Sequence, residues 1–298
     1  MDAVVSDRIG GAPISWGVCE APHWGYQLPP DRVLAEMRLL GLRATELGPT
    51  GYLGATPDDV RSRLDAHGLR LIGGFLPITM HVDAQADLGA ADDAMRTLAA
   101  GGAELVVLAA QSTDGSYDRK IALGEREWTA LVANLDRLRD LARRHGLTAT
   151  LHPHVGTAIE GRPSVLRLIE ASDIPICLDT GHLVIGGMEP LELLDVAADR
   201  IAHVHLKDVR TAVASTMSAG DASYIGAVRA GLYPPLGDGD LDIAGIVHAL
   251  EAAGYRGWYV VEQDAALYAE PEPDHGPVQY VARSIAFLTD AVASTRSR

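Results

Sequence analysis

The fold of this chain is decided by residues 175–206, PICLDTGHLVIGGMEPLELLDVAADRIAHVHL. Two short apolar runs, Pro175–Asp179 and Ile201–Leu206, enclose an amphipathic segment over Pro190–Ala198. Nearly continuous apolar runs of this length indicate strands that are buried on both faces, as in parallel sheets. The stretch therefore predicts one strand–helix–strand unit of an α/β protein.

The same alternation extends in both directions from this unit. Further apolar runs predict strands at 12–16, 43–47, 70–75, 104–109, 147–152 and 258–262. Further amphipathic segments predict helices at 30–40, 56–67, 86–100, 125–145, 163–171, 241–253 and 278–293. Eight strands, each followed by a helix, predict a closed (β/α)8 TIM barrel, and the lack of a low-complexity linker predicts a single domain over residues 1–298.

An open, doubly wound sheet is the alternative fold. It is disfavoured because no GxGxxG fingerprint for a dinucleotide follows the first predicted strand. The segment 210–240 breaks the alternation and is rich in glycine and proline. We expect it to form a long irregular active-site loop over the top of the barrel, where it would act as a lid.

Composition excludes several classes of function. The formal net charge of -15 repels phosphate backbones and anionic lipids, so nucleic acids and membrane surfaces are poor partners. Two cysteines, Cys19 and Cys177, are too few for a disulfide framework and indicate a reducing compartment. Neither a signal peptide nor an apolar run of membrane-spanning length is recognisable. We therefore expect a cytoplasmic protein that acts on a small molecule.

Ionisable side chains stand at the ends of four consecutive predicted strands, namely His152, Asp179, His205 and Glu262. In a TIM barrel the carboxyl ends of the strands meet on one face, which carries the active groups. Burying such groups unpaired is costly, and a shared divalent cation removes that cost. Nitrogen and oxygen ligands without a thiolate favour Mn or Co, with Mg or Zn as alternatives, over a structural zinc site.

Each of these residues taken alone has a plainer interpretation. A histidine at a strand end is commonly a polar cap, Asp179 could cap the following turn, and Glu262 could form a salt bridge. His203 faces the same way as His205 because side chains alternate along a strand. His205 is preferred only because it lies nearer the strand end. The agreement of four strand ends favours the metal site.

Other polar and aromatic residues are expected at the same end of the barrel. The residues predicted to transfer protons are Glu262, His154, His182 and Lys207. Those predicted to hold the substrate are Trp16, Glu46, Glu160 and Arg210. Core packing is an equal alternative for Trp16. Cys177 lies within an apolar strand and is expected in the core.

Several motifs of this sequence resemble those of a known superfamily. They are Asp179-Thr180-Gly181-His182, His203-Val204-His205-Leu206-Lys207-Asp208, and the runs at 12–17 (APISWG), 44–49 (ATELGP), 152–157 (HPHVGT), 237–242 (GDGDLD) and 258–264 (WYVVEQD). Together they resemble the xylose isomerase-like barrels, which include sugar epimerases, hydroxypyruvate isomerases and the endonuclease IV group. Within that superfamily they are most similar to inosose (2-keto-myo-inositol) dehydratases of inositol catabolism.

The resemblance implies a metal-dependent lyase that removes water from a cyclic keto-polyol through an enolate. Related epimerases carry a glutamate where this chain has His152, so a symmetric epimerisation by two carboxylates is disfavoured. A ketose 3-epimerase or isomerase, and a lyase that cleaves 3-keto-glycosides by β-elimination, remain alternatives. A catalytically silent sugar-binding barrel is a third. The resemblance also implies association into homo-oligomers, which the acidic composition does not oppose.

Overall fold

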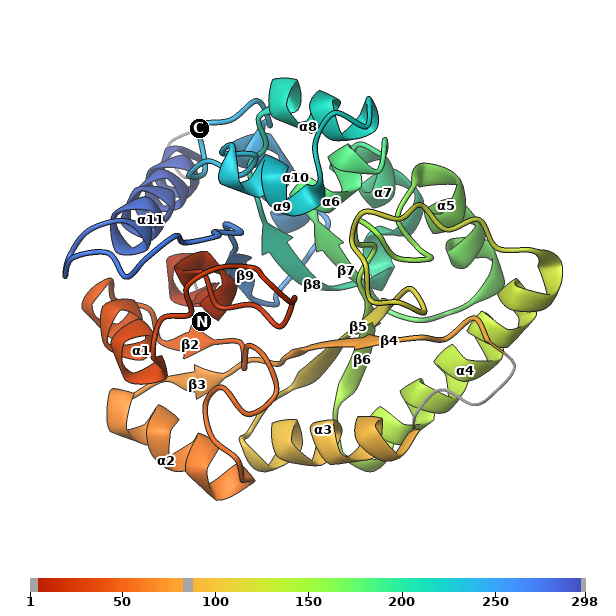
Figure 1. The fold of residues 1–298 in the computed structure, drawn as a ribbon, viewed down its shortest axis with the longest axis horizontal. Coiled ribbons are helices and arrows are strands. Elements are labelled where there is room, and N and C mark those ends of the chain that lie inside the picture. Colours follow the sequence, from red (N-terminus) through yellow and green to blue (C-terminus); the bar gives the residue numbers. More distant parts are fainter. Residues whose placement is uncertain (1–4, 83–87, 296–298) are drawn as a thin grey trace.

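The chain folds into a parallel barrel surrounded by helices, as the computed structural model of residues 5–82 and 88–295 shows (Figure 1). Every neighbouring pair of strands in the sheet runs parallel, in the order β3-β2-β1-β9-β8-β7-β6-β5-β4. The strands are β1 (Ile9–Gly11), β2 (Ala44–Thr45), β3 (Arg70–Leu71), β4 (Phe75–Ile78), β5 (Leu105–Ala110), β6 (Thr148–Leu151), β7 (Ile176–Asp179), β8 (Ile201–Leu206) and β9 (Tyr259–Val261).

The barrel closes because β3 and β4 are two pieces of one continuous strand. Leu47 N donates to the Gly73 carbonyl on one side, and Val107 N donates to the Gly74 carbonyl on the other. A side chain at Gly73 would bring a Cβ within 2.8 Å of the Leu105 carbonyl oxygen, so only glycine permits this close approach. The predicted eight-stranded barrel is therefore confirmed, with its third strand interrupted at the two glycines.

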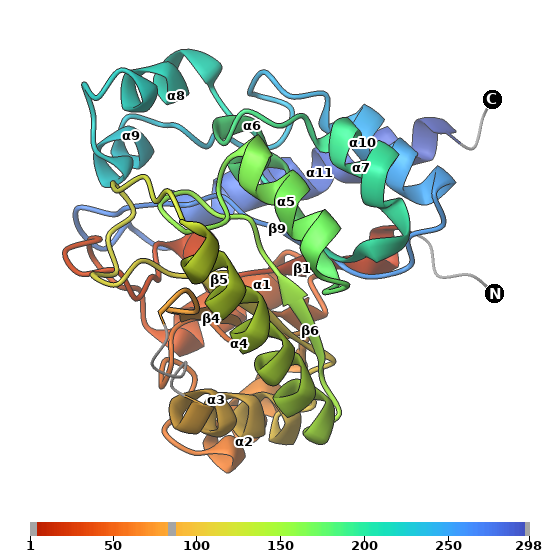
Figure 2. The same ribbon diagram turned by 90° about the vertical axis from the view of Figure 1, so that its right-hand side faces the viewer.

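Eight helices at predicted positions surround the sheet in the described part of the chain (Figures 1 and 2). They are α1 (Pro30–Leu39), α2 (Pro57–His67), α3 (Leu88–Ala100), α4 (Glu125–Arg144), α5 (Arg162–Ala171), α7 (Pro190–Ala197), α10 (Ile243–Ala252) and α11 (Pro277–Thr295). Each coincides with a predicted helix to within a few residues. The start of the helix predicted at 86–100 falls in residues 83–87, outside the described residues.

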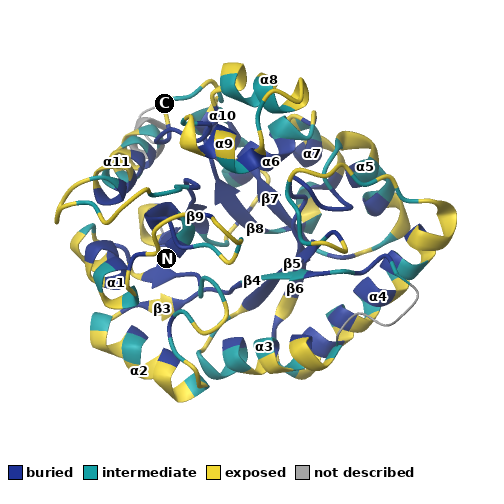
Figure 3. Ribbon diagram, in the orientation of Figure 1, coloured by how far each residue is buried: buried dark blue, intermediate teal, exposed yellow. Residues whose placement is uncertain are grey.

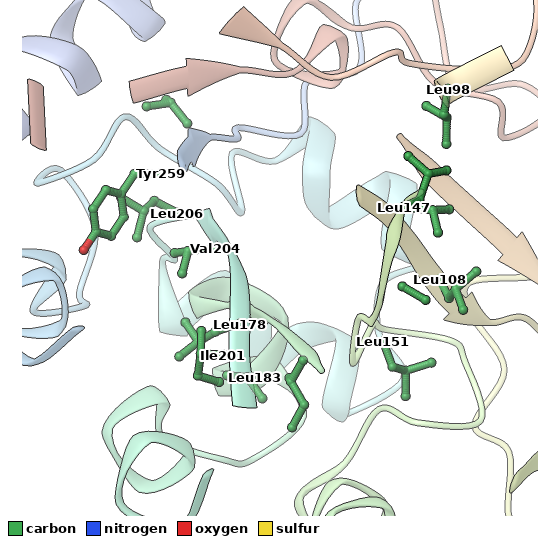
Figure 4. Packing of buried hydrophobic residues seen from close by; sticks show 14 of the residues in the cluster. Leu98, Leu108, Leu147, Leu151, Leu178, Leu183, Ile201, Val204, Leu206 and Tyr259 are labelled. Atoms are coloured by element: carbon green, nitrogen blue, oxygen red, sulfur yellow. The ribbon is translucent and has the colours of Figure 1, made fainter. Parts of the chain in front are cut away.

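Residues on the strands divide by alternation into an outer and an inner set. Leu108, Leu151, Leu178, Val204 and Tyr259 belong to the large apolar cluster that joins the sheet to the helices (Figure 4). The helices bury the faces that meet this cluster and expose the opposite faces (Figure 3). The intervening residues point into the barrel, where they pack in small clusters near its middle and carry ionisable groups toward its carboxyl end.

The first predicted strand, 12–16, is wrong by several residues. The strand is β1 (Ile9–Gly11), and Pro13–Trp16 forms a 3-10 turn, η2, that begins with proline. Two of the three residues of β1 are glycines, which carry no apolar signal. A Cβ at Gly10 would collide with the Ile72 side chain inside the barrel, so the narrow interior requires the glycine that conceals the strand.

The segment 210–240, predicted to be irregular, contains two helices. They are α8 (Thr211–Ser218) and α9 (Tyr224–Arg229), and both lie at one end of the barrel (Figure 2). Ser223 caps α9 by accepting from Gly226 N, and Tyr224 packs against Trp24 in a second apolar cluster. One further helix, α6 (Thr180–Ile185), directly follows β7. No helix in the described residues is long and apolar enough to cross a membrane.

Candidate functional site

A cavity of about 500 Å³ opens at the carboxyl end of the barrel. The ionisable side chains among its lining residues are Cys19, Glu20, Glu46, Tyr117, His152, His154, His205, Lys207, Tyr224, Glu262 and Asp264. Six of them lie at or just past the ends of β6, β8 and β9, because alternate residues at these strand ends point into the barrel; these are His152, His154, His205, Lys207, Glu262 and Asp264. Side chains that are far apart in the sequence therefore meet in one cavity, because each stands near the carboxyl end of its strand.

The four predicted metal ligands converge on Asp179. Its Oδ2 lies 3.5 Å from His152 Nε2 and 3.7 Å from His205 Nδ1. His205 Nδ1 in turn lies 3.4 Å from Glu262 Oε2. Asp179, His205 and Glu262 form one buried group of mutually close ligand atoms, and His152, Asp179 and His182 form another.

These atoms fit a divalent cation. Asp179 Oδ2 and His205 Nδ1 are buried without a hydrogen-bond partner, which is unfavourable unless something else satisfies them. Two ligand atoms that are each ~2.1 Å from a tetrahedral ion lie ~3.4 Å apart. The separations of 3.4 to 3.7 Å found here match that spacing. The donor set of imidazole nitrogen and carboxylate oxygen suits Mn, Co, Zn and Mg in different degrees and does not identify the ion.

Hydrogen bonds fix which nitrogen each ligating histidine would offer. His152 Nδ1 donates to the Pro153 carbonyl at 2.7 Å, which leaves Nε2 free toward Asp179. His205 Nε2 lies 3.0 Å from Glu46 Oε1, which leaves Nδ1 facing Asp179 and Glu262. A carboxylate or carbonyl behind a metal-binding imidazole holds its tautomer and orientation.

Glu46 thus lies behind the metal site, where it also binds a second histidine. His203 Nε2 lies 2.8 Å from the same Glu46 oxygen. Burial opposes ionisation of Glu46, but His205 and His203 outweigh it, so the pKa of this carboxyl is held far below its usual range. Glu46 also lines the cavity, so its predicted contact with the substrate stays a prediction.

Lys207 lies among the acidic groups of the site. Its Nζ is 2.9 Å from Glu262 Oε2, 2.9 Å from Asp264 Oδ1 and 3.4 Å from Asp179 Oδ2. Burial opposes the ammonium, but these three carboxylates outweigh it and hold the pKa of Lys207 well above its ordinary value. Lys207 therefore presents a charged ammonium group at the lining of the cavity.

His154 and His182 stack on each other beside the ligands, with ring centroids 3.8 Å apart. Burial, with the charges of His152 and Lys207, holds the pKa of His154 well below the ordinary value, and burial with the charges of His154 and Lys207 does the same for His182. His154 Nδ1 donates to the Val155 carbonyl at 2.8 Å, so its Nε2 is a free proton acceptor. His182 Nε2 lies 3.0 Å from Lys207 Nζ, and His182 itself does not line the cavity.

Sequence reasoning missed a polar network behind Lys207. Asp264 Oδ2 accepts from the Tyr224 hydroxyl at 2.6 Å, and that hydroxyl lies 3.1 Å from the Tyr233 hydroxyl. Asp264 follows Glu262 by two residues and so shares its face, a signal that alternation could have revealed. Tyr224 comes from α9, in the segment expected to be irregular, and no strand pattern indicates it.

Three residues predicted to hold the substrate lie elsewhere. Trp16 is fully buried and donates from its indole nitrogen to Glu36 Oε2, so core packing explains it. Glu160 accepts from Gly156 N, and Arg210 donates to the Gly231 carbonyl. None of the three lines the cavity described above, so their predicted contact with the substrate stays a prediction that this cavity does not support.

Cys177 is buried inside the barrel as expected and also lies within reach of two ligating histidines. It forms a group of close ligand atoms with His152 and His205. Burial raises the pKa of its thiol to about 11, despite the opposing charge of His205, and this favours the protonated thiol. We therefore place Cys177 with the core.

Comparisons with a family model and with known proteins point to the same family. A family model described as xylose isomerase-like TIM barrel matches residues 34–291. The chain is 34% identical to an inosose dehydratase of Geobacillus thermodenitrificans over 276 residues, which cover 87% of this chain and 91% of that protein. It is 32% identical to the rhizopine catabolism protein MocC of Rhizobium meliloti, with coverage of 94% and 86%.

Solved structures show the same fold at lower sequence identity. An L-ribulose 3-epimerase superposes with a TM-score of 0.70 at 18% identity, covering 97% of this chain and 96% of that one. The IOLI protein with a bound zinc atom superposes with a TM-score of 0.69 at 17% identity, with coverage of 96% and 98%. At these identities the likeness concerns the fold alone.

Proposed function

The chain belongs to the xylose isomerase-like TIM barrel family, and we propose that it is a metal-dependent inosose dehydratase. The observation that carries the proposal is the convergence of His152, Asp179, His205 and Glu262 beside a cavity that also presents a proton acceptor and a proton donor. Identity of 34% to an inosose dehydratase over most of both chains supports 2-keto-myo-inositol as the substrate.

Different residues of the site can carry out the separate steps of the elimination. A divalent cation held by the four ligands would supply positive charge that polarises the substrate ketone and favours enolate formation. His154 Nε2, neutral and facing the cavity, takes the proton from the carbon next to the ketone. Lys207 Nζ gives a proton to the hydroxyl on the following carbon, which leaves as water when that carbon–oxygen bond breaks.

Positioning residues complete this assignment. Lys207 is held between Glu262 and Asp264 at 2.9 Å from each, so its ammonium has a defined direction. His182 lies 3.0 Å behind it and is placed to relay a proton back to the lysine after each turnover. Because the acceptor on His154 and the donor on Lys207 are different groups, the site suits an elimination in which two protons move in opposite directions.

The rival reactions predict different products from the same enolate. A 3-epimerase or isomerase must return a proton to carbon, and related epimerases use a glutamate at the position of His152 for this purpose. A lyase for 3-keto-glycosides would expel an alcohol in place of water. Analysis of the product by mass therefore distinguishes the three, since only dehydration removes the mass of one water.

The test uses purified protein stripped with a chelator and reloaded with Mn or Co. On 2-keto-myo-inositol we expect a metal-dependent rise in near-ultraviolet absorbance, because dehydration yields an enolised dione that the substrate lacks. Glu262→Gln and Asp179→Asn should each abolish the rise. The control is Glu192→Gln, which alters an ion pair with Arg162 on the outer surface.

The outcome of this test decides between the proposal and its rivals. Loss of water that depends on metal, and on Glu262 and Asp179, supports the dehydratase. Turnover with retention of mass would replace it by an epimerase or isomerase. Tight metal binding with no turnover of any keto-polyol would instead support a silent sugar-binding barrel.

A further inference from the structure

The cavity has two chemically different halves. The ionisable groups that could bind or transform a keto-polyol, among them His152, Lys207 and Glu262, follow β6, β8 and β9. The opposite half is formed by segments that follow β1 and β2 and by β4 itself. These segments also carry Cys19, Glu20, Glu46 and Thr50, but most of their lining residues are apolar, so the ionisable cluster faces a largely apolar surface across the cavity.

The apolar half is a continuous wall, which we call the apolar wall. It consists of Ile14, Val18, Pro49, Phe75 and Pro77. Four of these five residues, all except Val18, are only partly buried, so the wall is accessible from the cavity. Phe75 joins the two halves, because its ring centroid is 5.5 Å from that of His154 and 6.1 Å from that of His152.

Two polar side chains near this wall, those of Tyr117 and Trp24, are already engaged. The Tyr117 hydroxyl donates to Glu20 Oε1 at 2.7 Å at the rim. The Trp24 indole nitrogen donates to the Ala265 carbonyl at 2.7 Å. Hydroxyl groups of a ligand that were pressed against Ile14 or Pro77 would therefore lose water without gaining a comparable partner.

This wall does not match an unsubstituted cyclitol ketone. Such a substrate bears oxygen on every ring carbon, and one aromatic ring such as Phe75 is enough to cover the C–H face of a polyol ring. The aliphatic residues Ile14, Val18, Pro49 and Pro77 add further apolar lining to that of Phe75. The cavity volume of about 500 Å³ also falls in the range of roughly 300–1,000 Å³ that suits ligands larger than one six-membered ring.

We propose that the site accepts cyclic keto-polyols that carry an apolar substituent, such as an O-alkyl or O-aryl ether, with that substituent against the apolar wall. The inference rests on the proposed function, because it places the keto-polyol ring at the ionisable half. It goes beyond that function by naming a substrate class with an apolar appendage. Burial of the substituent supplies binding energy that an unsubstituted ring cannot obtain.

The first experiment measures binding without turnover. Calorimetric titration of the metal-loaded protein compares myo-inositol, its O-benzyl ether and its O-(2,3-dihydroxypropyl) ether. Removing an aromatic group from water into an apolar wall should lower the dissociation constant of the benzyl ether by roughly tenfold or more relative to myo-inositol. The O-(2,3-dihydroxypropyl) ether also has a bulky substituent, but its dissociation constant should not fall below that of myo-inositol. Equal affinities for the benzyl ether and myo-inositol would overturn the inference.

A pair of variants tests where the substituent lies. Ile14→Asn places an amide in the apolar wall, on a half-buried residue of η2, and should abolish most of the gain for the benzyl ether. Leu191→Asn makes a comparable change on a residue of α7 that is 44% exposed and lies away from the cavity, and it should preserve the gain. If Ile14→Asn leaves the higher affinity for the benzyl ether unchanged, the substituent lies elsewhere, which contradicts the proposal.

A second measurement covers the case in which Ile14→Asn does not fold. The ratio of kcat/KM for the O-benzyl ether of 2-keto-myo-inositol to that for the unsubstituted ketone should exceed one in the natural protein. Turnover of both ketones with a ratio below one would refute the substituent site while leaving the dehydratase intact. Tighter binding of the benzyl ether, with no turnover of either ketone, would refute the dehydratase and leave the apolar binding site supported.

Discussion

Asp179 uses its two carboxylate oxygens for two separate tasks. Oδ1 accepts from His182 N at 2.8 Å and so caps α6, while Oδ2 faces His152, His205 and Lys207. The capping role and the proposed ligand role, which are alternatives when the sequence is considered alone, are therefore compatible. The cap orients the carboxylate in advance, which reduces the ordering that a metal ion would have to impose.

At the same scale, the hydrogen bond from His205 to Glu46 predicts an effect on metal affinity. Glu46→Gln removes the negative charge that holds His205 Nε2 and leaves Nδ1 less basic toward the metal. We expect the dissociation constant for Mn or Co to rise by about 10- to 100-fold, as is typical when such a partner is lost. Competition with a chromophoric chelator measures it. Glu104→Gln on the surface is the control, and an unchanged affinity in Glu46→Gln would exclude this supporting role.

The buried histidines predict sensitivity to acid in the metal-free protein. The pKa values of His154 and His182 are depressed in the folded state, so the unfolded chain binds protons that the folded chain does not. Their contribution is fully present above the unfolded pKa of about 6.5 and is lost as the pH falls through that value, by up to ~1.4 kcal/mol per pH unit for each histidine.

Urea unfolding between pH 7.5 and 5 in the presence of a chelator measures this slope. His154→Gln should make the free energy of unfolding less dependent on pH, because one of the groups that gain a proton on unfolding is gone. His67→Gln, a change on the outer surface of α2, should leave the slope as it is. A slope that does not change in His154→Gln would contradict the assignment of a neutral buried imidazole.

The candidate ligands could be predicted from the sequence because they follow from one rule, the position of strand ends. His152, Asp179, His205 and Glu262 all stand at or just past the ends of strands whose apolar runs were placed correctly. The predicted position of Trp16 at a strand end is wrong for the converse reason. The first strand ends at Gly11, so Trp16 does not stand at a strand end.

At the scale of elements, long helices were predictable because local residues fix their ends. Pro30 begins α1, and Thr56 begins α2 with a capping box in which its hydroxyl and the Asp59 carboxylate exchange hydrogen bonds with the backbone. The short helix α8 was not predictable, because its residues are mostly Ala, Ser and Thr and none is buried. Without a buried face the apolar period that indicates a helix is missing.

The capping box makes a prediction for α2. Thr56→Ala removes the side-chain acceptor for Asp59 N and the partner of the Asp59 carboxylate, and should lower the free energy of unfolding by about 0.5–2 kcal/mol. Chemical denaturation measures the change. Thr289→Ala, at an exposed position within α11, should have a smaller effect, because it removes no cap. Equal effects of the two substitutions would show that the capping box contributes nothing.

At the scale of the whole molecule, the barrel gathers buried ionisable groups at the carboxyl end of its strands. Asp179 Oδ2 and His205 Nδ1 are buried there without hydrogen-bond partners, and Lys207 pairs with Asp264 and Glu262 beside them. Because ionisable residues stand at the ends of the predicted strands, the sequence predicts that they meet at one end of the barrel. It does not predict the opposing apolar wall. That wall comes from Ile14 in η2 and Pro49 in a loop, whose positions depend on the closure of the barrel.

Removal of the metal should therefore destabilise the whole fold. An ion that binds only the folded state stabilises it by about 2.7 kcal/mol when its free concentration is 100 times the dissociation constant. For a chain of this size we expect a chelator to lower Tm by about 5 °C or more relative to the metal-loaded protein. Scanning calorimetry with and without Mn or Co measures the shift.

Two variants separate this effect from non-specific binding of ions to an acidic surface. Glu262→Gln removes one ligand and also relieves the burial of a carboxyl whose pKa is raised, so the metal-free variant should be no less stable than the metal-free natural protein. It should nevertheless lose most of the metal-dependent rise in Tm. Glu192→Gln lowers the surface charge by the same amount and should keep the rise. A rise that persists in Glu262→Gln would locate the stabilising ion away from the barrel end, since a four-ligand site that has lost a charged oxygen cannot hold a divalent ion equally well.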